Sequence, residues 1–314
     1  EPTAGVPFWE VWFGIAGLAE YVMGRPVTDL ASQAAFGQQM GWEYLTLSVP
    51  CRQPGSASAL ASDGTSHYVP RGRIPLEELY ARPDPDLTEA IEKGQEIVRV
   101  ARAEGMAVIA YVPWCFHAGA TAIGLEQFAL LCYDEPEYVH ALFEWVEEGT
   151  RRAIREALIP LGVDVVLFDG DCAYRNGLMV NPRMFRELVF NRTAKTVAPL
   201  REAGVLYTFH SDGKADDLLP ILIELGFSGF HGVEAQANDL ADIKRRFGRD
   251  ITLIGNMDVV FLTRATVQEV RAQTARMLAT GMEGGRYIAA CNTSPLDYIP
   301  YENYLAMVDV INHF

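Results

Sequence analysis

The sequence lacks the features that mark membrane, secreted or nucleic-acid-binding proteins. No run of 18 apolar residues occurs in its 314 residues, and the chain begins with neither the basic cluster nor the apolar stretch of a signal peptide. No five consecutive residues are Lys or Arg, and the formal net charge is −15. We therefore expect no membrane span, no nucleic-acid partner and a cytoplasmic location. Because the chain does not begin with Met, we also expect residues to precede Glu1.

Cysteine is scarce, and several common catalytic motifs are missing. The five cysteines are an odd number, lie far apart and include no C-x-x-C pair, which argues against a disulfide framework. The sequence contains no G-x-x-x-x-G-K-[ST] phosphate loop, no G-x-G-x-x-G after a strand, no H-E-x-x-H and no G-x-S-x-G. These absences disfavour nucleotide kinases, dinucleotide enzymes, zinc peptidases of that class and serine hydrolases.

What the sequence does contain is a repeated alternation of short apolar runs and helical patterns. Continuous apolar runs such as VIAYV and VVLF are typical of parallel strands that are buried on both faces. Eight such strands are predicted, at Phe8–Trp12, Tyr44–Ser48, Ala107–Val112, Asp164–Phe168, Val205–Phe209, Phe227–Gly232, Ile251–Ile254 and Tyr287–Ala290. The length fits either two domains of about 150 residues or one α/β barrel. Eight strand-and-helix units favour a single (β/α)8 TIM barrel that spans residues 1–314.

The helices between these strands are predicted from their apolar periodicity and their capping residues. They are expected at Thr28–Met40, Asp86–Ala103, Pro136–Leu158, Pro182–Ala203, Asp216–Leu225, Asp239–Phe247, Thr266–Thr280 and Tyr301–Ile311. One region, 50–85, is too long and too rich in Pro and Gly for a simple strand-to-helix turn. We interpret it as an inserted lid over the barrel mouth, and a solvated excursion without function is the alternative.

Polar side chains follow several predicted strands, at the barrel end where active sites are built. The fifth strand gives the sharpest pattern, because His210 and Asp212 share one face of an extended segment. With Cys291 after the eighth strand, they supply nitrogen, oxygen and sulfur donors for a zinc ion. Alternatively, His210 makes a hydrogen bond at the top of the barrel, and Asp212 caps the next helix.

Other strand ends carry candidates for acid–base chemistry and substrate binding. Asp169 and Asp171 after the fourth strand form either a carboxylate pair or a set of caps, and Tyr174 follows them. After the sixth strand come His231 and Glu234, and after the seventh come Asn256 and Asp258 as substrate-binding candidates. Four aromatic residues lie near strand ends: Trp9, Trp12, Tyr111 and Trp114. They form either an aromatic floor for a substrate or simple packing of the barrel mouth.

The ordered segments VDVVLFDGDCAYRNGLMVNPRMF, FHSDGKADDLLPILIELGFSGFHGVEAQANDLADIKRRFG, ITLIGNMDVVFL, GGRYIAACN and IPYENY resemble the uroporphyrinogen decarboxylase superfamily. More specifically, they are similar to its branch of cobalamin-dependent methyltransferases. In that branch, zinc is held by a His-x-Cys pair after the fifth strand and a Cys near the eighth. His210 and Cys291 match this pattern, but Asp212 stands in place of the first Cys. The resemblance thus implies His210 and Cys291 as ligands, with Asp212 or Glu234 in the third place, or else an empty site.

The resemblance implies a zinc-dependent methyltransferase that moves a methyl group from a small methoxylated or methylated donor to a corrinoid (cobalamin) carried by a partner protein. O-demethylation is favoured, and Asp169, Tyr174 or Glu234 would protonate the leaving oxygen. The nearest variant is methyl transfer from the corrinoid to a thiol. A decarboxylase-like lyase anchored by Asp169 is a second possibility. It is disfavoured because the stretch after Trp12, where the decarboxylases carry their arginines, has none before Arg25. A non-catalytic corrinoid- or tetrapyrrole-binding barrel is the third.

Overall fold

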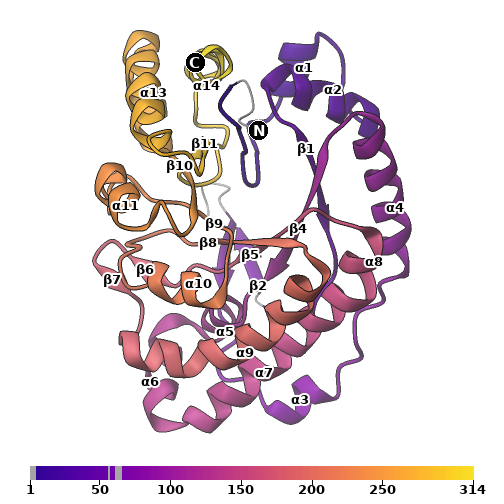
Figure 1. The fold of residues 1–314 in the computed structure, drawn as a ribbon. Helices are drawn as coiled ribbons and strands as arrows, with labels where there is room; N and C mark the ends of the chain where they lie inside the picture. Colours follow the sequence, from indigo (N-terminus) through magenta and orange to yellow (C-terminus); the bar gives the residue numbers. More distant parts are fainter. Residues whose placement is uncertain (1–4, 56, 61–65) are drawn as a thin grey trace.

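A curved parallel sheet forms the centre of the molecule (Figure 1). The computed structural model describes residues 5–55, 57–60 and 66–314. The strand order of the sheet is β1-β4-β5-β8-β9-β10-β11, and every neighbouring pair is parallel. The strands span Tyr44–Ser48 (β1), Ala107–Pro113 (β4), Val165–Asp169 (β5), Leu206–His210 (β8), Gly229–His231 (β9), Thr252–Met257 (β10) and Tyr287–Cys291 (β11). Seven of the eight predicted strands are therefore confirmed, and the sheet curls into a TIM-like barrel.

The first predicted strand, Phe8–Trp12, is wrong as a full strand. Only Phe8 makes sheet contacts there, as an isolated parallel bridge to Trp42 and to Ala289. The backbone then leaves the extended region, because Trp12 has a φ of +50°. The barrel wall between β11 and β1 is thus closed by the two bridges of Phe8, one to Ala289 in β11 and one to Trp42 just before β1.

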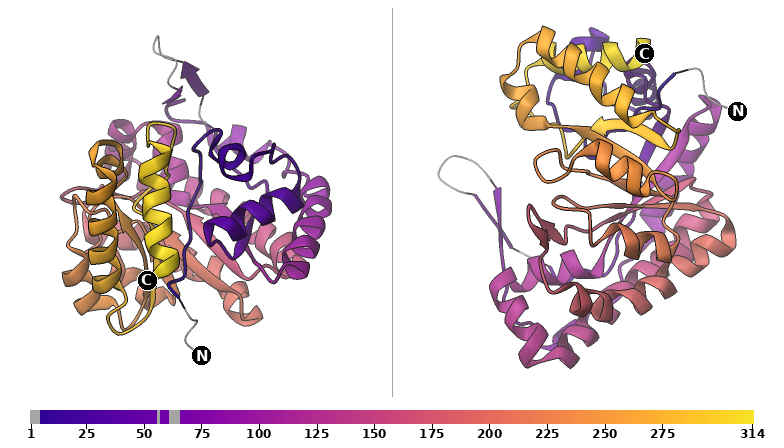
Figure 2. Two further views of the ribbon diagram at one scale, coloured as in Figure 1. Left: turned by 90° about the horizontal axis from the view of Figure 1, so that it is seen from above. Right: turned by 60° about the vertical axis from the view of Figure 1, so that its left-hand side comes forward.

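Helices cover the outer face of the sheet (Figure 2), and buried apolar side chains from both layers form one continuous core. The helices span Leu18–Met23 (α1), Leu30–Met40 (α2), Leu76–Tyr80 (α3), Thr88–Ala103 (α4), Cys115–Ile123 (α5), Leu125–Asp134 (α6), Pro136–Ala153 (α7), Ile159–Leu161 (α8), Pro182–Ala203 (α9), Leu219–Leu225 (α10), Leu240–Phe247 (α11), Val259–Arg264 (α12), Val267–Gly281 (α13) and Tyr301–His313 (α14). A π-helical turn, Ile154–Leu158, joins α7 to α8. All eight predicted helices are found, and α1, α3, α5, α6, α8 and α12 are additional.

The region 50–85 contains a hairpin that projects from the body of the molecule (Figure 2). Its strands, β2 (Ala57–Leu60) and β3 (Ser66–Val69), are antiparallel. At its base, Arg52 forms ion pairs with Asp84 and with Glu148 on α7. Gly149 permits this close approach, since a Cβ there would lie 2.5 Å from the Cβ of Arg52. The base of the insertion is therefore packed against α7, and its action as a lid stays a prediction. Residues 56 and 61–65 of the predicted insertion lie outside the described residues.

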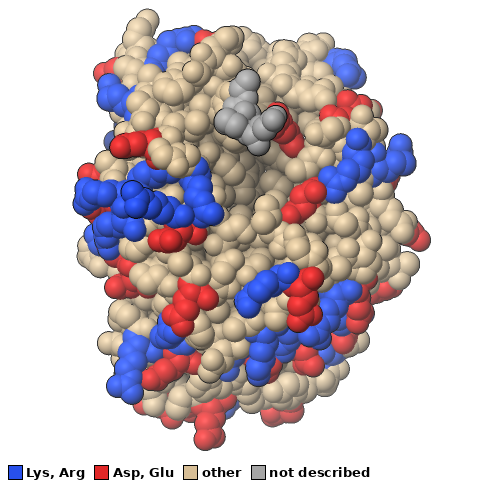
Figure 3. Space-filling view, in the orientation of Figure 1, with Lys and Arg blue, Asp and Glu red and all other residues tan. Residues whose placement is uncertain are grey.

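Charges of both signs lie around the face shown in Figure 3, and its centre is largely uncharged. Lys and Arg gather over α11, whose last turn carries Lys244, Arg245 and Arg246. A second pair of antiparallel strands, β6 (Ala173–Tyr174) and β7 (Gly177–Leu178), lies outside the barrel sheet. Within the described residues, no single helix is long and apolar enough to span a membrane; α5 and α6 together have that length and composition but are bent by 109°.

Candidate metal centre

Three neighbouring strands bring polar side chains together at the carboxyl end of the barrel. The parallel register pairs Asp169 at the end of β5 with His210 at the end of β8, and His210 with His231 at the end of β9. The chain then turns away from the sheet, and Asp171 and Asp212 follow the ends of β5 and β8. The ends of parallel strands thus place residues that are far apart in sequence at one rim.

The tightest group of potential metal ligands consists of Asp171, His210 and Asp212, each of which places a donor atom within 4.8 Å of the other two. No other set of three His, Cys, Asp or Glu side chains in the described part of the chain meets this condition. His210 Nε2 lies 3.6 Å from Asp171 Oδ1. The backbone N–H of Asp212 donates to that same oxygen over 2.9 Å, which fixes the Asp171 carboxylate beside the imidazole.

The ring of His210 is oriented by a second histidine. The Nδ1 atoms of His210 and His231 are 2.8 Å apart, so one donates a hydrogen bond to the other. Burial, and then the nearby His210, lower the pKa of His231 well below its usual value, which keeps this ring neutral. When His210 donates from Nδ1, its Nε2 is left as a free lone pair on the side of Asp171. A second residue that fixes the tautomer in this way is common for metal-binding histidines.

One carboxylate oxygen of Asp212, in the same group as His210 and Asp171, has no hydrogen-bond partner among the described residues. This oxygen, Oδ1, is buried. Burial raises the pKa of Asp212 to about 6, and the proximity of His210 opposes this rise. Asp169 is also affected, because burial raises the pKa of its carboxyl. A buried carboxylate oxygen without a donor is costly, and a bound cation would satisfy it.

Cys291 is completely buried at the end of β11, and a glutamate holds its backbone. The Cys291 N–H donates to Glu10 Oε2 over 3.1 Å, while the Tyr304 hydroxyl donates to Glu10 Oε1 over 3.1 Å. The main chain of Glu10 is fixed as well, because its N–H and its carbonyl both bond to the Tyr44 hydroxyl. Burial raises the pKa of Glu10 to about 7 and also raises that of the Cys291 thiol. The thiol lies beside Glu10 and is not part of the three-residue group.

The remaining polar candidates take structural roles in this arrangement. Glu234 accepts a hydrogen bond at Oε2 from the backbone N–H of Gly213, over 2.8 Å. Asn256 is buried and donates to the carbonyl of Val233. Asp258 caps α12 by accepting from the backbone N–H of Val260. Glu234 therefore stabilises the loop at Gly213, which directly follows His210 and Asp212.

The aromatic candidates divide into two groups. Trp12 packs edge-on against His210 with 5.2 Å between the ring centroids, and its other neighbour is Tyr111 at 5.3 Å. Trp114, by contrast, is buried behind the sheet, where its indole N–H donates to Thr193 on α9. Tyr174 lies on the β6–β7 pair and is 50% exposed. Of these candidates, Trp12 thus packs directly against the metal-ligand group, and Tyr111 packs against Trp12.

Sequence reasoning missed one site residue, Glu10, and did not assign the role of another, His231. Glu10 lies inside the apolar run PFWEVWFG, and a single acidic residue in such a run is a signal for a buried, hydrogen-bonded carboxyl. His231 ends β9 just as His210 ends β8, so their contact follows from the alignment of the two strand ends.

Comparison with known proteins assigns the family. The family model described as "Uroporphyrinogen decarboxylase (URO-D)" matches residues 70–314. The chain belongs to the uroporphyrinogen decarboxylase family. A search of curated proteins finds no match. Among solved structures, a methyltransferase from Methanosarcina mazei aligns over 100% of this chain and 95% of its own, with 19% identity and a TM-score of 0.73.

More distant solved structures include a family 5 xyloglucanase from Paenibacillus pabuli, with 11% identity over 98% of both chains and a TM-score of 0.49. A D-psicose 3-epimerase from Clostridium cellulolyticum H10 has 8% identity over 91% of this chain and 92% of its own, with a TM-score of 0.48. The methyltransferase likeness shows that this member of the uroporphyrinogen decarboxylase family shares its fold.

Proposed function

We propose that this protein is a zinc-dependent methyltransferase that transfers a methyl group from a small methoxylated donor to the cobalt of a corrinoid carried by a partner protein. The observation that carries the proposal is the group of Asp171, His210 and Asp212 at the carboxyl end of the barrel. The family assignment and the fold shared with a methyltransferase support it. The missing arginines after Trp12 argue against a substrate with many carboxylates, as a decarboxylase of this family would need.

The residues present fit a zinc ion. His210 offers Nε2, and Asp212 offers an oxygen that is buried and has no partner among the described residues. Together they supply the nitrogen and oxygen donors that zinc accepts. We propose Asp212 over Glu234 for the third place, because Glu234 already accepts a backbone hydrogen bond. Asp171, which the backbone N–H of Asp212 holds beside His210, is a further proposed oxygen donor. Cys291 lies outside this group and stays the proposed sulfur ligand by its match to the methyltransferase branch.

When bound, zinc supplies a Lewis acid that stabilises negative charge on the oxygen of the donor. Two residues of the chain position the proposed zinc ligands. His231 holds the His210 ring through the Nδ1 contact, and Glu10 holds the backbone at Cys291. In the overall reaction the methyl–oxygen bond breaks, a methyl–cobalt bond forms, and the donor oxygen gains a proton. Asp169, whose pKa is raised by burial, is the proposed source of that proton.

Metal analysis of the purified protein tests the ligand assignment. We expect about one zinc per chain, as for a catalytic site with three protein ligands. His210→Ala, Cys291→Ala and Asp212→Ala should each lose most of this zinc, while Glu234→Ala should keep it. His313→Ala, in the exposed last turn of α14, is the matched control and should bind zinc normally. Stoichiometric zinc in both His210→Ala and Cys291→Ala would refute the assignment.

A further inference from the structure

The segment that carries Asp212 is held by neighbouring loops along its whole length. We call residues 211–215, which directly follow β8, the ligand segment. Each of its consecutive backbone N–H groups donates a hydrogen bond to a residue outside the segment. In the order of the donors, the acceptors are the His231 carbonyl (3.4 Å), Asp171 Oδ1 (2.9 Å), Glu234 Oε2 (2.8 Å), the Tyr174 carbonyl (2.9 Å) and Asn238 Oδ1 (2.9 Å). The acceptors come from the chain after β5 and from the end of β9 onwards, so the segment is held from both neighbouring strands.

Asn238 holds the ligand segment through both ends of its side-chain amide. Its Oδ1 accepts from the Ala215 N–H, and its Nδ2 donates to the Gly213 carbonyl over 2.9 Å and to the Glu234 carbonyl over 3.1 Å. These partners fix the orientation of the amide, because a backbone N–H requires the oxygen and two carbonyls require the NH2 group. The side chain is buried, and its oxygen and both of its N–H groups are used.

The backbone around Asn238 is itself fixed. The N–H groups of Ala237 and Asn238 both donate to the Glu234 carbonyl, over 3.0 and 2.8 Å. Asp239, the next residue, caps α11 by accepting from the backbone N–H of Ala241. The Asn238 amide therefore projects from a tight turn that leads directly into a helix, which makes it a rigid support for the ligand segment.

The ligand segment is also packed closely against β6, on the side of the β5 loop. Gly213 has a φ of +90°, and a Cβ there would lie 2.6 Å from the carbonyl carbon and oxygen of Ala173, the first residue of β6. Both the conformation and the close approach require glycine at this position. Gly213 is thus confined between the backbone of β6 and the amide of Asn238, which binds its carbonyl.

This arrangement determines where Asp212 can lie. Its own N–H is bonded to Asp171, and the residue that follows it, Gly213, is bonded at both its N–H and its carbonyl. A carboxylate on a loop that is already held in place loses little conformational entropy when it binds a metal. Residues that orient the ligands of a metal without touching it contribute about 10–100-fold to metal affinity.

From these contacts we infer that Asn238 is a positioning residue of the candidate metal centre: by holding the ligand segment, it keeps Asp212 beside His210. The inference rests on the proposed function for the metal at this site, and it adds a residue that is not a ligand. Glu234 accepts one hydrogen bond from the segment, whereas Asn238 makes two and also bonds to the Glu234 carbonyl. Removal of the Asn238 amide therefore frees the segment while every proposed ligand keeps its side chain.

Zinc affinity, measured by competition with a chromogenic chelator, tests this role. We expect Asn238→Ala to bind zinc at least about tenfold more weakly than the wild type. Asn303→Ala is the matched control, because Asn303 is also buried and its Nδ2 also donates to two backbone carbonyls, those of Leu262 and Ala265. It should bind zinc as the wild type does. A general loss of stability would affect both variants, whereas a loss of positioning affects only Asn238→Ala.

Hydrogen exchange, followed by mass spectrometry, tests whether the ligand segment is the part that changes. Peptides that cover 211–215 should exchange about tenfold faster in Asn238→Ala, because the Ala215 N–H loses its acceptor, and should be unchanged in Asn303→Ala. Asn238→Ser, which keeps a small polar side chain, is measured in parallel in case the alanine variant does not fold. Wild-type zinc affinity in the Asn238 variants, or unchanged exchange at 211–215, would overturn the inference.

The outcomes separate this inference from the proposed function. If the wild type binds zinc and the Asn238 variants bind it equally well, the inference fails and the proposed function is unaffected. If their zinc affinity falls as expected but no methyl group reaches cobalt, the inference stands and the methyltransferase proposal fails. A wild-type protein that binds no zinc would overturn both.

Discussion

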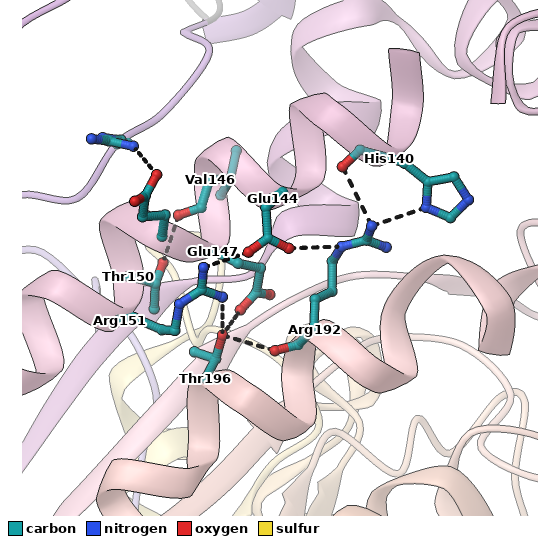
Figure 4. A network of polar contacts seen from close by, with 10 residues as sticks. His140, Glu144, Val146, Glu147, Thr150, Arg151, Arg192 and Thr196 are labelled. Carbon is teal, nitrogen blue, oxygen red and sulfur yellow. Dashed lines mark hydrogen bonds and ion pairs between the residues drawn. The ribbon is translucent and has the colours of Figure 1, made fainter. Parts of the chain in front are cut away.

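Glu147 shows how a single buried carboxyl affects the stability of this protein. It lies on α7, is 1% exposed, and accepts a hydrogen bond from the Thr196 hydroxyl on α9 (Figure 4). Cys115 on α5 and Arg151 on α7 also face it, and Cys51 lies close enough to be affected by its charge. Its Oε1 has no partner among the described residues. Burial is the largest effect and raises the pKa of Glu147.

A raised pKa in the folded state means that the neutral form of Glu147 favours folding. This contribution is complete below the ordinary pKa of a glutamate, about 4.3, and is lost as the pH rises through the raised value. Glu147→Gln keeps an acceptor for Thr196 and has no charge. The variant should therefore gain free energy of unfolding relative to the wild type as the pH rises from 4.5 to 8. Urea unfolding at several pH values measures this, with Glu148→Gln, on the exposed side of α7, as the control. A difference that does not change with pH would contradict the account.

At the same scale, the sequence indicates some site residues and not others. His210 and Asp212 can be paired because alternate residues of an extended segment share a face, and the structure places them within 4.8 Å of each other and of Asp171. The link between Glu10 and Cys291 joins residues 281 positions apart, and only the closure of the barrel brings them together. No local pattern encodes that contact.

Elements whose ends carry specific signals are predicted best. Helix α9 is predicted with its observed bounds, because Asn181 caps it, Pro182 follows, and Gly204 ends it in the left-handed conformation. The strand predicted at Phe8–Trp12 is wrong because an apolar run alone cannot show whether a partner strand is in register. Additional helices such as α5 lie within loops whose apolar residues pack against the core.

Helix α13 offers a test of capping. Thr266 accepts from the backbone N–H of Glu269, and the Glu269 carboxylate accepts from the backbone N–H of Thr266. Thr266→Ala removes half of this capping box and should lower the free energy of unfolding by about 1 kcal/mol. Urea denaturation measures the loss. Gln268→Ala, an exposed change in the first turn of the same helix, should stay within about 0.5 kcal/mol of the wild type. Equal effects of the two changes would argue against the cap.

At the scale of the whole molecule, the barrel and the charge together limit what the protein can bind. The alternation of strands and helices predicts the barrel, because each unit buries its apolar face against the next. The net charge of −15 disfavours nucleic acid but does not select a substrate. The barrel closes between β11 and β1 through the isolated bridges of Phe8 to Ala289 and to Trp42. This incomplete closure could not be predicted from sequence, since it depends on how far one segment pairs with its neighbours.

The most direct test of the central claim, methyl transfer to cobalt, is the absorption spectrum of the corrinoid. The zinc-loaded protein is mixed anaerobically with Co(I) cobalamin and 2-methoxyphenol, and the spectrum is followed in time. We predict conversion to methyl-Co(III) with release of the demethylated phenol, at a rate that depends on the protein and is lost in His210→Ala. If no methyl-Co(III) forms from 2-methoxyphenol or from a panel of methoxyarenes, methylamines and methyl thiols, the account is contradicted.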